Sequence, residues 1–265
     1  MSSTPNVAAL LQSAKDQGNL SAQSMQAFNV FDIGAQIQAA LGTPVDEFQS
    51  SEVMLVTTLI DDSGSIRFVS GNTEAVREGH NTVIDALNAS KQSDQILLYT
   101  QYLNGQILNP FRPLAQATRM DSSNYDPKGR TPLYDETVVV LGTVMAKTQE
   151  FAENGVPARS VTLLVTDSHD EHSTKQTPRQ VASVIADMLK AENHIVAAMG
   201  IDDGQIDFRA VFQEMGIRDE WILTPGNTPS EIRKAFQVFS QSAVRASQGA
   251  ASFSKEAIGG GFGNP

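Results

Sequence analysis

The feature that most constrains this chain is an apolar run that ends abruptly in polar residues. Residues 53–60 read Val-Met-Leu-Val-Thr-Thr-Leu-Ile, and Asp61-Asp62-Ser63-Gly64-Ser65 follows at once. A run of this length, rich in β-branched residues, predicts a strand that is buried on both faces of a parallel sheet. Open α/β sheets bind their ligands at the carboxyl ends of their strands, so the sequence predicts a binding site at residues 61–65.

Three of these polar residues suit a metal ion. Asp61, Ser63 and Ser65 are spaced two residues apart, and an extended backbone points alternate side chains to the same side. One carboxylate and two neutral hydroxyls are hard oxygen donors with little net charge. Such a set fits Mg²⁺, which keeps several waters and leaves a position for an outside ligand.

Two further segments place oxygen donors next to predicted elements. Gly129-Arg130-Thr131 ends a polar loop, and Pro132 can open a helix that continues to about residue 152. Residues 160–166 form a second apolar run, Ser-Val-Thr-Leu-Leu-Val-Thr, and Asp167 follows it. The second buried strand therefore also ends in a carboxylate.

These three segments, in this order, resemble the metal-ion-dependent adhesion site (MIDAS) of von Willebrand factor A (vWA) domains. The resemblance covers about residues 52–245. It implies a Mg²⁺ ion, with Mn²⁺ or Ca²⁺ as alternatives, which binds a Glu or Asp side chain of a partner protein. The metal-site residues that it implies are Asp61, Ser63, Ser65, Thr131 and Asp167.

The rest of the chain alternates between strand and helix patterns, which predicts an α/β fold with a doubly wound, mostly parallel sheet. Asn104-Gly105 separates two apolar runs and predicts a β-hairpin at a sheet edge. The vWA resemblance implies a Rossmann-like strand order of 3-2-1-4-5-6 with strand 3 antiparallel. The predicted strands are 53–60, 95–103, 106–114, 160–166, 194–201 and 220–224, and the predicted helices are 73–90, 132–152, 180–192, 208–215 and 229–247.

We expect three parts: an N-terminal helical arm or cover over 1–50, a vWA domain over 51–248, and a flexible glycine-rich tail over 249–265. One or two helices are predicted within residues 21–41. The arm either covers the domain or binds a partner. If it reaches the metal site, an acidic residue such as Asp46 or Glu47 would cap the ion.

The composition limits the kinds of partner that we expect, and the first residues and the apolar runs bear on the cellular compartment. Nineteen Lys and Arg against 30 Asp and Glu give a formal charge of -11, which argues against nucleic acid or an anionic membrane as partner. The absence of cysteine excludes disulfides and thiol catalysis. The first residues lack the pattern of a signal peptide, and no apolar run reaches the ~18 residues of a membrane helix. We expect a cytoplasmic protein.

Two function classes follow from these residues. The first is a non-enzymatic binding module, which most resembles bacterial stand-alone vWA proteins linked to tellurium resistance or paired with MoxR-type AAA+ ATPases. That resemblance implies an adaptor or scaffold role with an AAA+ ATPase as partner. The alternative is a magnesium-dependent hydrolase or phosphotransferase that uses Asp61. Ser63 stands where aspartate-based phosphatases need a second Asp, so binding is the favoured class.

The loop that follows the predicted strand 160–166 is unusually polar, because the six residues from Asp167 to His172 include two histidines and three carboxylates. Residues His169 to His172 could form a second metal site or an acid-base site, but their spacing matches no zinc pattern, and a solvated loop around the first site is favoured. Asp62 is expected to face solvent rather than to tune the site. His80 and His194 are expected to be ordinary structural residues.

Overall fold

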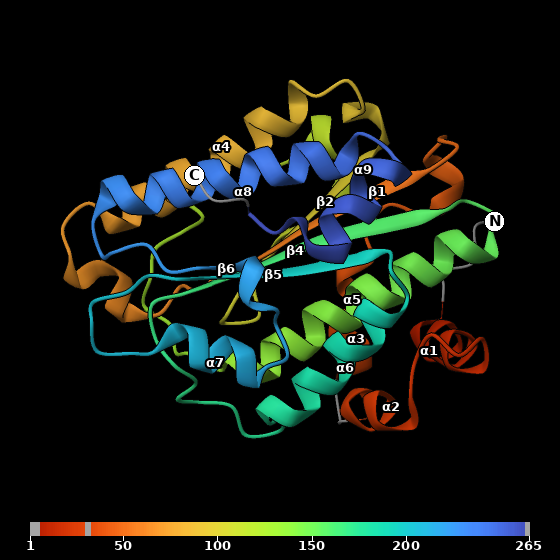
Figure 1. Cartoon of the computed structure of the whole chain (residues 1–265), viewed down its shortest axis with the longest axis horizontal. Coiled ribbons are helices and arrows are strands. Elements are labelled where there is room, and N and C mark those ends of the chain that lie inside the picture. The colour runs from red at the N-terminus through yellow and green to blue at the C-terminus, as the bar shows by residue number, and fades with distance from the viewer. Residues whose placement is uncertain (1–5, 30–32, 263–265) are drawn as a thin grey trace.

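The computed structural model describes residues 6–29 and 33–262, which form a six-stranded sheet with helices on both faces (Figure 1). The strand order is β3-β2-β1-β4-β5-β6. β3 is antiparallel to β2, and the other neighbouring strands are parallel. This confirms the predicted order. The strands are β1 (Val53–Ile60), β2 (Ile96–Tyr102), β3 (Ile107–Pro113), β4 (Ala158–Thr166), β5 (His194–Gly200) and β6 (Ile222–Leu223).

Strand β1 lies at the centre of the sheet, and all eight of its residues are buried. Val56 pairs with Leu98 of β2 on one side and with Val161 of β4 on the other. Helices cover both faces, so neither face of β1 meets water, which explains its unbroken apolar run. The predicted hairpin joins β2 to β3 through Asn104-Gly105, where Gly105 adopts a φ of 84°.

Helices α4 and α8 cover one face of the sheet, and α5, α6 and α7 lie on the other (Figure 1). Gly79 allows α4 to approach α8 closely, because a Cβ at this position would lie 2.1 Å from the ring of Phe236. None of the helices in the described part of the chain has the length and hydropathy of a membrane span. The helices of the two layers are α4 (Asn72–Asn88), α5 (Leu133–Glu153), α6 (Pro178–Lys190), α7 (Phe208–Glu214) and α8 (Pro229–Ser247).

The N-terminal segment packs against α5 and α6 through α1 (Val7–Asp16), α2 (Ala22–Phe28) and α3 (Ile33–Ala40). Helix α1 lies outside the range predicted to be helical, and Val30 and Phe31 of that range lie outside the described residues. Lys147 of α5 fixes the end of the segment, since its Nζ donates to the Thr43 carbonyl oxygen over 2.5 Å.

Asp46 and Glu47 lie far from the predicted metal site, in the short 3₁₀ turn Val45–Glu47. The ring of the next residue, Phe48, packs 6.0 Å from that of Phe151, near the C-terminal end of α5. A helix of 21 residues is about 30 Å long, and Thr131 precedes its other end. The idea that an acidic residue of the arm caps the metal is therefore wrong for Asp46 and Glu47.

The C-terminal segment is helical in place of the flexible tail predicted for 249–265. It forms α9 (Ala250–Lys255) and a π-helical turn over Glu256–Gly260. Phe253 is buried, and the ring of Phe262 lies 5.2 Å from that of Trp221. These aromatic side chains find apolar partners on the domain, which glycine content alone does not reveal. Strand β6, beside Trp221, has two residues rather than the predicted five.

Candidate metal centre

The carboxyl-terminal edge of the sheet brings together the ends of β1 and β4. The two strands pair in parallel up to Ile60 and Val165, and Asp61 N then donates to the Val165 carbonyl oxygen over 2.9 Å. Asp61 and Asp167 therefore follow neighbouring strands at the same edge. The 3₁₀ helix η2 (Gly64–Phe68) continues from this point, at the left of Figure 1.

Three of the predicted ligands are in direct contact. The Ser63 and Ser65 hydroxyl oxygens lie 2.9 Å apart. Ser65 Oγ donates to Asp167 Oδ1 over 2.7 Å, and Ser63 Oγ lies 3.4 Å from the same carboxylate oxygen. The structure thus gathers two hydroxyls and one carboxylate from segments more than 100 positions apart in the chain.

Asp61 lies beneath this oxygen cluster and is fully buried. Its Oδ1 accepts a hydrogen bond from Ser63 N over 2.7 Å, and its Oδ2 accepts one from the Thr166 hydroxyl over 2.6 Å. The carboxylate is therefore held in one orientation, with both oxygens engaged. It fixes the backbone turn that presents the two serine hydroxyls.

The carboxylates of this edge sit in an environment that disfavours their charge. Burial raises the pKa of Asp61, against hydrogen bonds from Ser63 and Thr166 that lower it. Burial, together with the negative charge of Asp61, raises the pKa of Asp167 to about 6. A bound cation would oppose both effects, because it favours the ionised form of each carboxylate.

Thr131 is carried to the site by its neighbour Gly129. Gly129 forms an isolated parallel bridge with Ser63, and its N–H donates to the Asp62 carbonyl oxygen over 2.8 Å. A Cβ on Gly129 would lie 3.0 Å from the Asp62 carboxylate, so the small residue permits this approach. Thr131 is 2% exposed. No hydrogen bond within the described residues joins its hydroxyl to the other four predicted ligands.

The polar loop after Asp167 clamps the segment that carries Thr131. Glu171 N and His172 N both donate to the Thr131 carbonyl oxygen over 3.2 Å, and Thr131 N donates back to His172 Nδ1 over 3.2 Å. Asp170 accepts a hydrogen bond from Tyr134 N, 3.2 Å away, in the first turn of α5. Loop and helix start are thereby held together.

Asp135 adds a second tie between the same two segments. Its carboxylate accepts hydrogen bonds from the backbone N–H groups of Thr174, Lys175 and Gln176. The sequence reasoning missed the role of Asp135 and of Asp170. The available signal was local, because Asp170 stands three residues before Ser173 in a spacing typical of side-chain-to-backbone turns.

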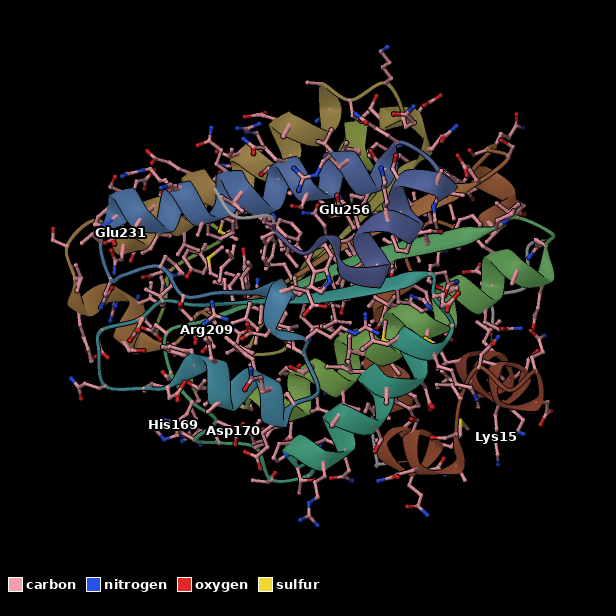
Figure 2. All side chains as sticks on the ribbon, viewed as in Figure 1. Lys15, His169, Asp170, Arg209, Glu231 and Glu256 are labelled. Atoms are coloured by element: carbon pink, nitrogen blue, oxygen red, sulfur yellow. The ribbon has the colours of Figure 1, made fainter. Side chains whose placement is uncertain are left out.

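The polar residues of this loop make hydrogen bonds to the start of α5 and do not form the second metal site that was considered for them. Across residues 6–29 and 33–262, no three His, Asp or Glu side chains are grouped to hold a metal ion. Figure 2 shows His169 and Asp170 together on the loop, far from Lys15 of α1. The polar residues of the loop therefore hold the segment that carries Thr131.

Asp62 was expected to face solvent, and the structure shows that it is buried instead. It is 5% exposed, and its Oδ1 accepts a hydrogen bond from Asn104 N over 3.0 Å at the turn of the β2–β3 hairpin. Burial raises its pKa to about 6. His80 and His194 are buried and bonded to Thr100 and Ser160, as expected of structural residues.

The oxygen cluster fits a divalent cation by the chemistry of its donors. Two hydroxyls and one carboxylate gather at this edge, with distances of 2.7, 2.9 and 3.4 Å among the oxygens of Ser63, Ser65 and Asp167. Hard oxygen donors of this kind are the ligands that divalent ions such as Mg²⁺, Mn²⁺ and Ca²⁺ take in proteins.

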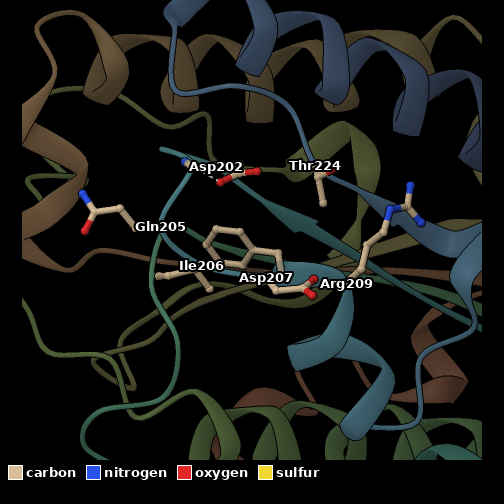
Figure 3. A pocket seen from close by; sticks show the side chains of 8 residues that line it. Asp202, Gln205, Ile206, Asp207, Arg209 and Thr224 are labelled. Atoms are coloured by element: carbon tan, nitrogen blue, oxygen red, sulfur yellow. Dashed lines mark hydrogen bonds between the residues drawn. The ribbon is translucent and has the colours of Figure 1, made fainter.

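A second hollow lies at the ends of β5 and β6, with a volume of about 430 Å³ (Figure 3). Its charged side chains are engaged within the chain. Asp202 accepts a hydrogen bond from Gly204 N, Asp207 caps α7 through Ala210 N, and Arg209 pairs with Asp219. The oxygen cluster at β1 and β4 is the better candidate for a functional site.

The strand order and the two helical layers define the class of the fold, which is that of the vWA domain. Neither a protein-family model nor a curated protein matches the sequence. Among solved structures, the chain is similar to the pilus adhesin SpaC from Lactobacillus rhamnosus GG, with 11% identity over 74% of this chain and 31% of that chain, and a TM-score of 0.52.

Two other solved structures are similar at lower TM-scores. A von Willebrand factor type A protein from Catenulispora acidiphila has 16% identity over 74% of this chain and 44% of that chain, with a TM-score of 0.42. The manganese-loaded TRAP protein of Plasmodium vivax has 20% identity over 71% and 74%, with a TM-score of 0.44. The chain spans 31% of SpaC, and the likeness to SpaC concerns the fold alone.

Proposed function

We propose that this chain is a metal-dependent protein-binding module. A divalent ion, held by Asp61, Ser63, Ser65, Thr131 and Asp167, would bind an acidic side chain of a partner protein. The observation that supports this most is the contact among the Ser63, Ser65 and Asp167 oxygens at the carboxyl-terminal edge of a vWA fold. That edge is where open α/β sheets bind ligands.

The donor set explains why such a metal centre would bind a partner carboxylate rather than only stabilise the fold. Ser63, Ser65 and Thr131 offer neutral hydroxyls, so few negative charges neutralise the ion. When bound, the ion would supply an electrophilic position for a carboxylate from outside the chain. Asp61 orients the Ser63 turn, and the clamp of Asp170 and His172 holds the Thr131 segment. We propose Mg²⁺ as the ion, with Mn²⁺ or Ca²⁺ as substitutes.

The geometry supports binding over catalysis by Asp61. A nucleophilic carboxylate must contact its substrate directly, whereas Asp61 is 0% exposed and both of its oxygens accept hydrogen bonds. Toward an ion, Asp61 would instead act through a bound water and through the Ser63 turn that it orients. The alternative of a magnesium-dependent hydrolase or phosphotransferase predicts phosphate release from a generic phosphoester. The binding proposal predicts none, and this assay separates the two.

The partner would be a protein that offers a Glu or Asp side chain to the metal. The role of this chain would be that of an adaptor or scaffold. An AAA+ ATPase is one such partner and rests on family resemblance alone. An affinity pull-down of this chain with Mg²⁺, repeated with a chelator, would test the class directly. A partner retained only with Mg²⁺ supports the proposal, and a partner indifferent to the chelator contradicts it.

Calorimetric titration with MgCl₂ tests the centre itself. We expect Ser63→Ala and Asp167→Ala to weaken Mg²⁺ binding at least about tenfold, because each removes an oxygen of the cluster. Ser183→Ala is the matched control, since its hydroxyl donates only to the Arg179 carbonyl oxygen of its own helix. Equal Mg²⁺ affinity in all four proteins would show that the cluster is not the metal site.

A further inference from the structure

One large apolar side chain stands out on the surface beside the candidate centre. Within residues 6–29 and 33–262, Phe68 is the exposed large hydrophobic residue, with 86% of its surface accessible. It ends η2, the 3₁₀ helix that contains Ser65. Side chains three residues apart in a 3₁₀ helix eclipse one another, and the rise between them is about 6 Å. Phe68 therefore lies one turn from Ser65 on the same side of η2.

The exposure of Phe68 is not explained by the fold. Its neighbour Ile66 is 1% exposed, so η2 already has an apolar side chain to anchor it to the domain. A fully exposed Phe forgoes about 1.5–3 kcal/mol of burial free energy, which a partner can recover. Aromatic residues are also enriched among the anchors of protein interfaces.

The flank of the centre next to Phe68 is basic, although the chain as a whole carries a charge of -11. Arg67 lies beside Phe68, and Lys128 and Arg130 belong to the loop that Gly129 bridges to Ser63. Asp126 pairs with Arg67 and Lys128. Arg130 is exposed and makes no ion pair with the part of the chain that the structure describes.

The clamp loop after Asp167 carries both signs of charge. Asp170 is occupied by the start of α5, and Lys175 follows Glu171 in the same loop. The excess of positive charge beside the centre therefore lies on the side of Arg67, Lys128 and Arg130. A flexible acidic segment would be attracted to that side.

We propose that the surface formed by Arg67, Phe68, Lys128 and Arg130 selects the partner. The segment that it fits has one acidic side chain for the metal, a large apolar residue close by to cover Phe68, and further acidic residues toward Arg130. The inference rests on the proposed metal-dependent function and adds the chemistry of the recognised sequence.

Selection from a phage-displayed library of random peptides tests the proposal. The full chain is panned with Mg²⁺ present, and bound phage are eluted with a chelator. We expect the wild type to enrich an acidic residue together with a nearby large apolar residue. Phe68→Ser, at an exposed position that leaves the fold intact, should enrich the acidic residue alone.

The enriched peptide is then synthesised and its Kd measured. Phe68→Ser should raise the Kd about tenfold or more. Arg130→Glu should also raise it, mainly by slowing association, while Lys91→Glu is the matched charge reversal at the amino-terminal edge of the sheet and should have little effect.

The outcomes separate the two proposals. Metal-dependent acidic peptides that lack an apolar residue, or that bind Phe68→Ser as tightly as the wild type, overturn this inference and leave the metal-dependent function standing. A selection that yields no chelator-eluted peptide contradicts both.

Discussion

Two of the places where this domain buries charged groups differ in whether the described part of the chain supplies the opposite charge. Under the N-terminal segment, fully buried Lys147 pairs with Glu150 at 2.7 Å and donates to the Thr43 carbonyl oxygen. At the sheet edge, Asp61 accepts hydrogen bonds from Ser63 N and the Thr166 hydroxyl, and Asp167 accepts them from the Ser63 and Ser65 hydroxyls. None of the described hydrogen bonds or ion pairs of these two carboxylates involves a cationic side chain.

The difference separates a structural charge from a functional one. Burial lowers the pKa of Lys147, but Glu150 opposes this, and the Lys147 ammonium joins the N-terminal segment to α5 through the Thr43 carbonyl oxygen. Burial raises the pKa of Asp61, and burial together with the charge of Asp61 raises the pKa of Asp167, so a cation from outside would favour the ionised form of both. A buried charge without a partner in the chain is thus the clearer sign of a binding site.

The largest effect is expected from breaking the buried ion pair between Lys147 and Glu150. Lys147→Met should lower the free energy of unfolding by about 3–5 kcal/mol, because it leaves Glu150 buried without its cation. Urea unfolding of the variant measures the change. The double variant Lys147→Met/Glu150→Leu is the control and should recover most of the loss. A single variant as stable as the wild type would mean that the pair does not hold the arm.

Acid titration tests a third kind of buried group, one that stays neutral. Burial lowers the pKa of both His80 and His194 to about 4, from an ordinary value of 6.5. The unfolded chain takes up these protons first, so the stability that the two groups contribute is complete above pH 6.5 and falls as the pH drops toward 4. The loss approaches about 3 kcal/mol for each histidine.

Urea unfolding at several pH values measures this slope. The variant His80→Gln/His194→Gln should lose stability less steeply between pH 6.5 and 4 than the wild type. Glu136 acts in the opposite sense, since burial raises its pKa to about 7 and its contribution grows as the pH falls below that value. Glu136→Gln should therefore steepen the decline. Identical slopes in all three proteins would refute the assignment.

Metal addition tests Asp61 and Asp167, two buried carboxylates that have no cationic partner among the described residues. At a Mg²⁺ concentration one hundred times its Kd, the free energy of unfolding should rise by about 2.7 kcal/mol. At the same Mg²⁺ concentration, Asp167→Asn should reduce this gain to about 1.4 kcal/mol or less, because its Mg²⁺ affinity falls at least about tenfold. Without metal, the same variant should be at least as stable as the wild type, because the repulsion from Asp61 is gone. A variant that gains as much stability with Mg²⁺ as the wild type would place the ion elsewhere.

The smallest effect is expected from the clamp. Asp170→Ala removes the charged acceptor of the Tyr134 N–H and should cost about 1–3 kcal/mol of stability. It should also weaken Mg²⁺ binding, because the Thr131 segment loses a tie. Asp187→Ala, which frees the Ser21 N–H far from the centre, is the control for an equivalent lost acceptor. Weakened Mg²⁺ binding in both variants would deny the clamp a special role.

Much of the fold is legible in the sequence where burial is continuous. The run at residues 53–60 and the alternation after it predicted a doubly wound, mostly parallel sheet, and the vWA resemblance implied its strand order, which the structure confirms. Helix α1 was missed although Val7, Leu10, Leu11 and Ala14 have helical spacing and are buried. Its composition, rich in small and polar residues, concealed the pattern.

The candidate site was only partly legible. Hydroxyls and carboxylates at strand ends pointed to Ser63, Ser65 and Asp167, and the structure brings those three together. The burial of Asp62 under the Asn104 turn and the exposure of Phe68 depend on contacts between distant segments. No local pattern encodes them, since the same residue types occur both inside and outside folded domains.

The contact between Trp221 and Phe262 makes the docking of the C-terminal segment measurable by tryptophan fluorescence. Trp221 is the only tryptophan in the sequence, so the intrinsic fluorescence excited at the indole comes from one position. It is 3% exposed, and the Phe262 ring covers it. Release of the C-terminal segment would expose the indole and shift its emission to longer wavelength. Undocking of the C-terminus can thus be monitored in unlabelled protein while a ligand is titrated at the distant strand edge.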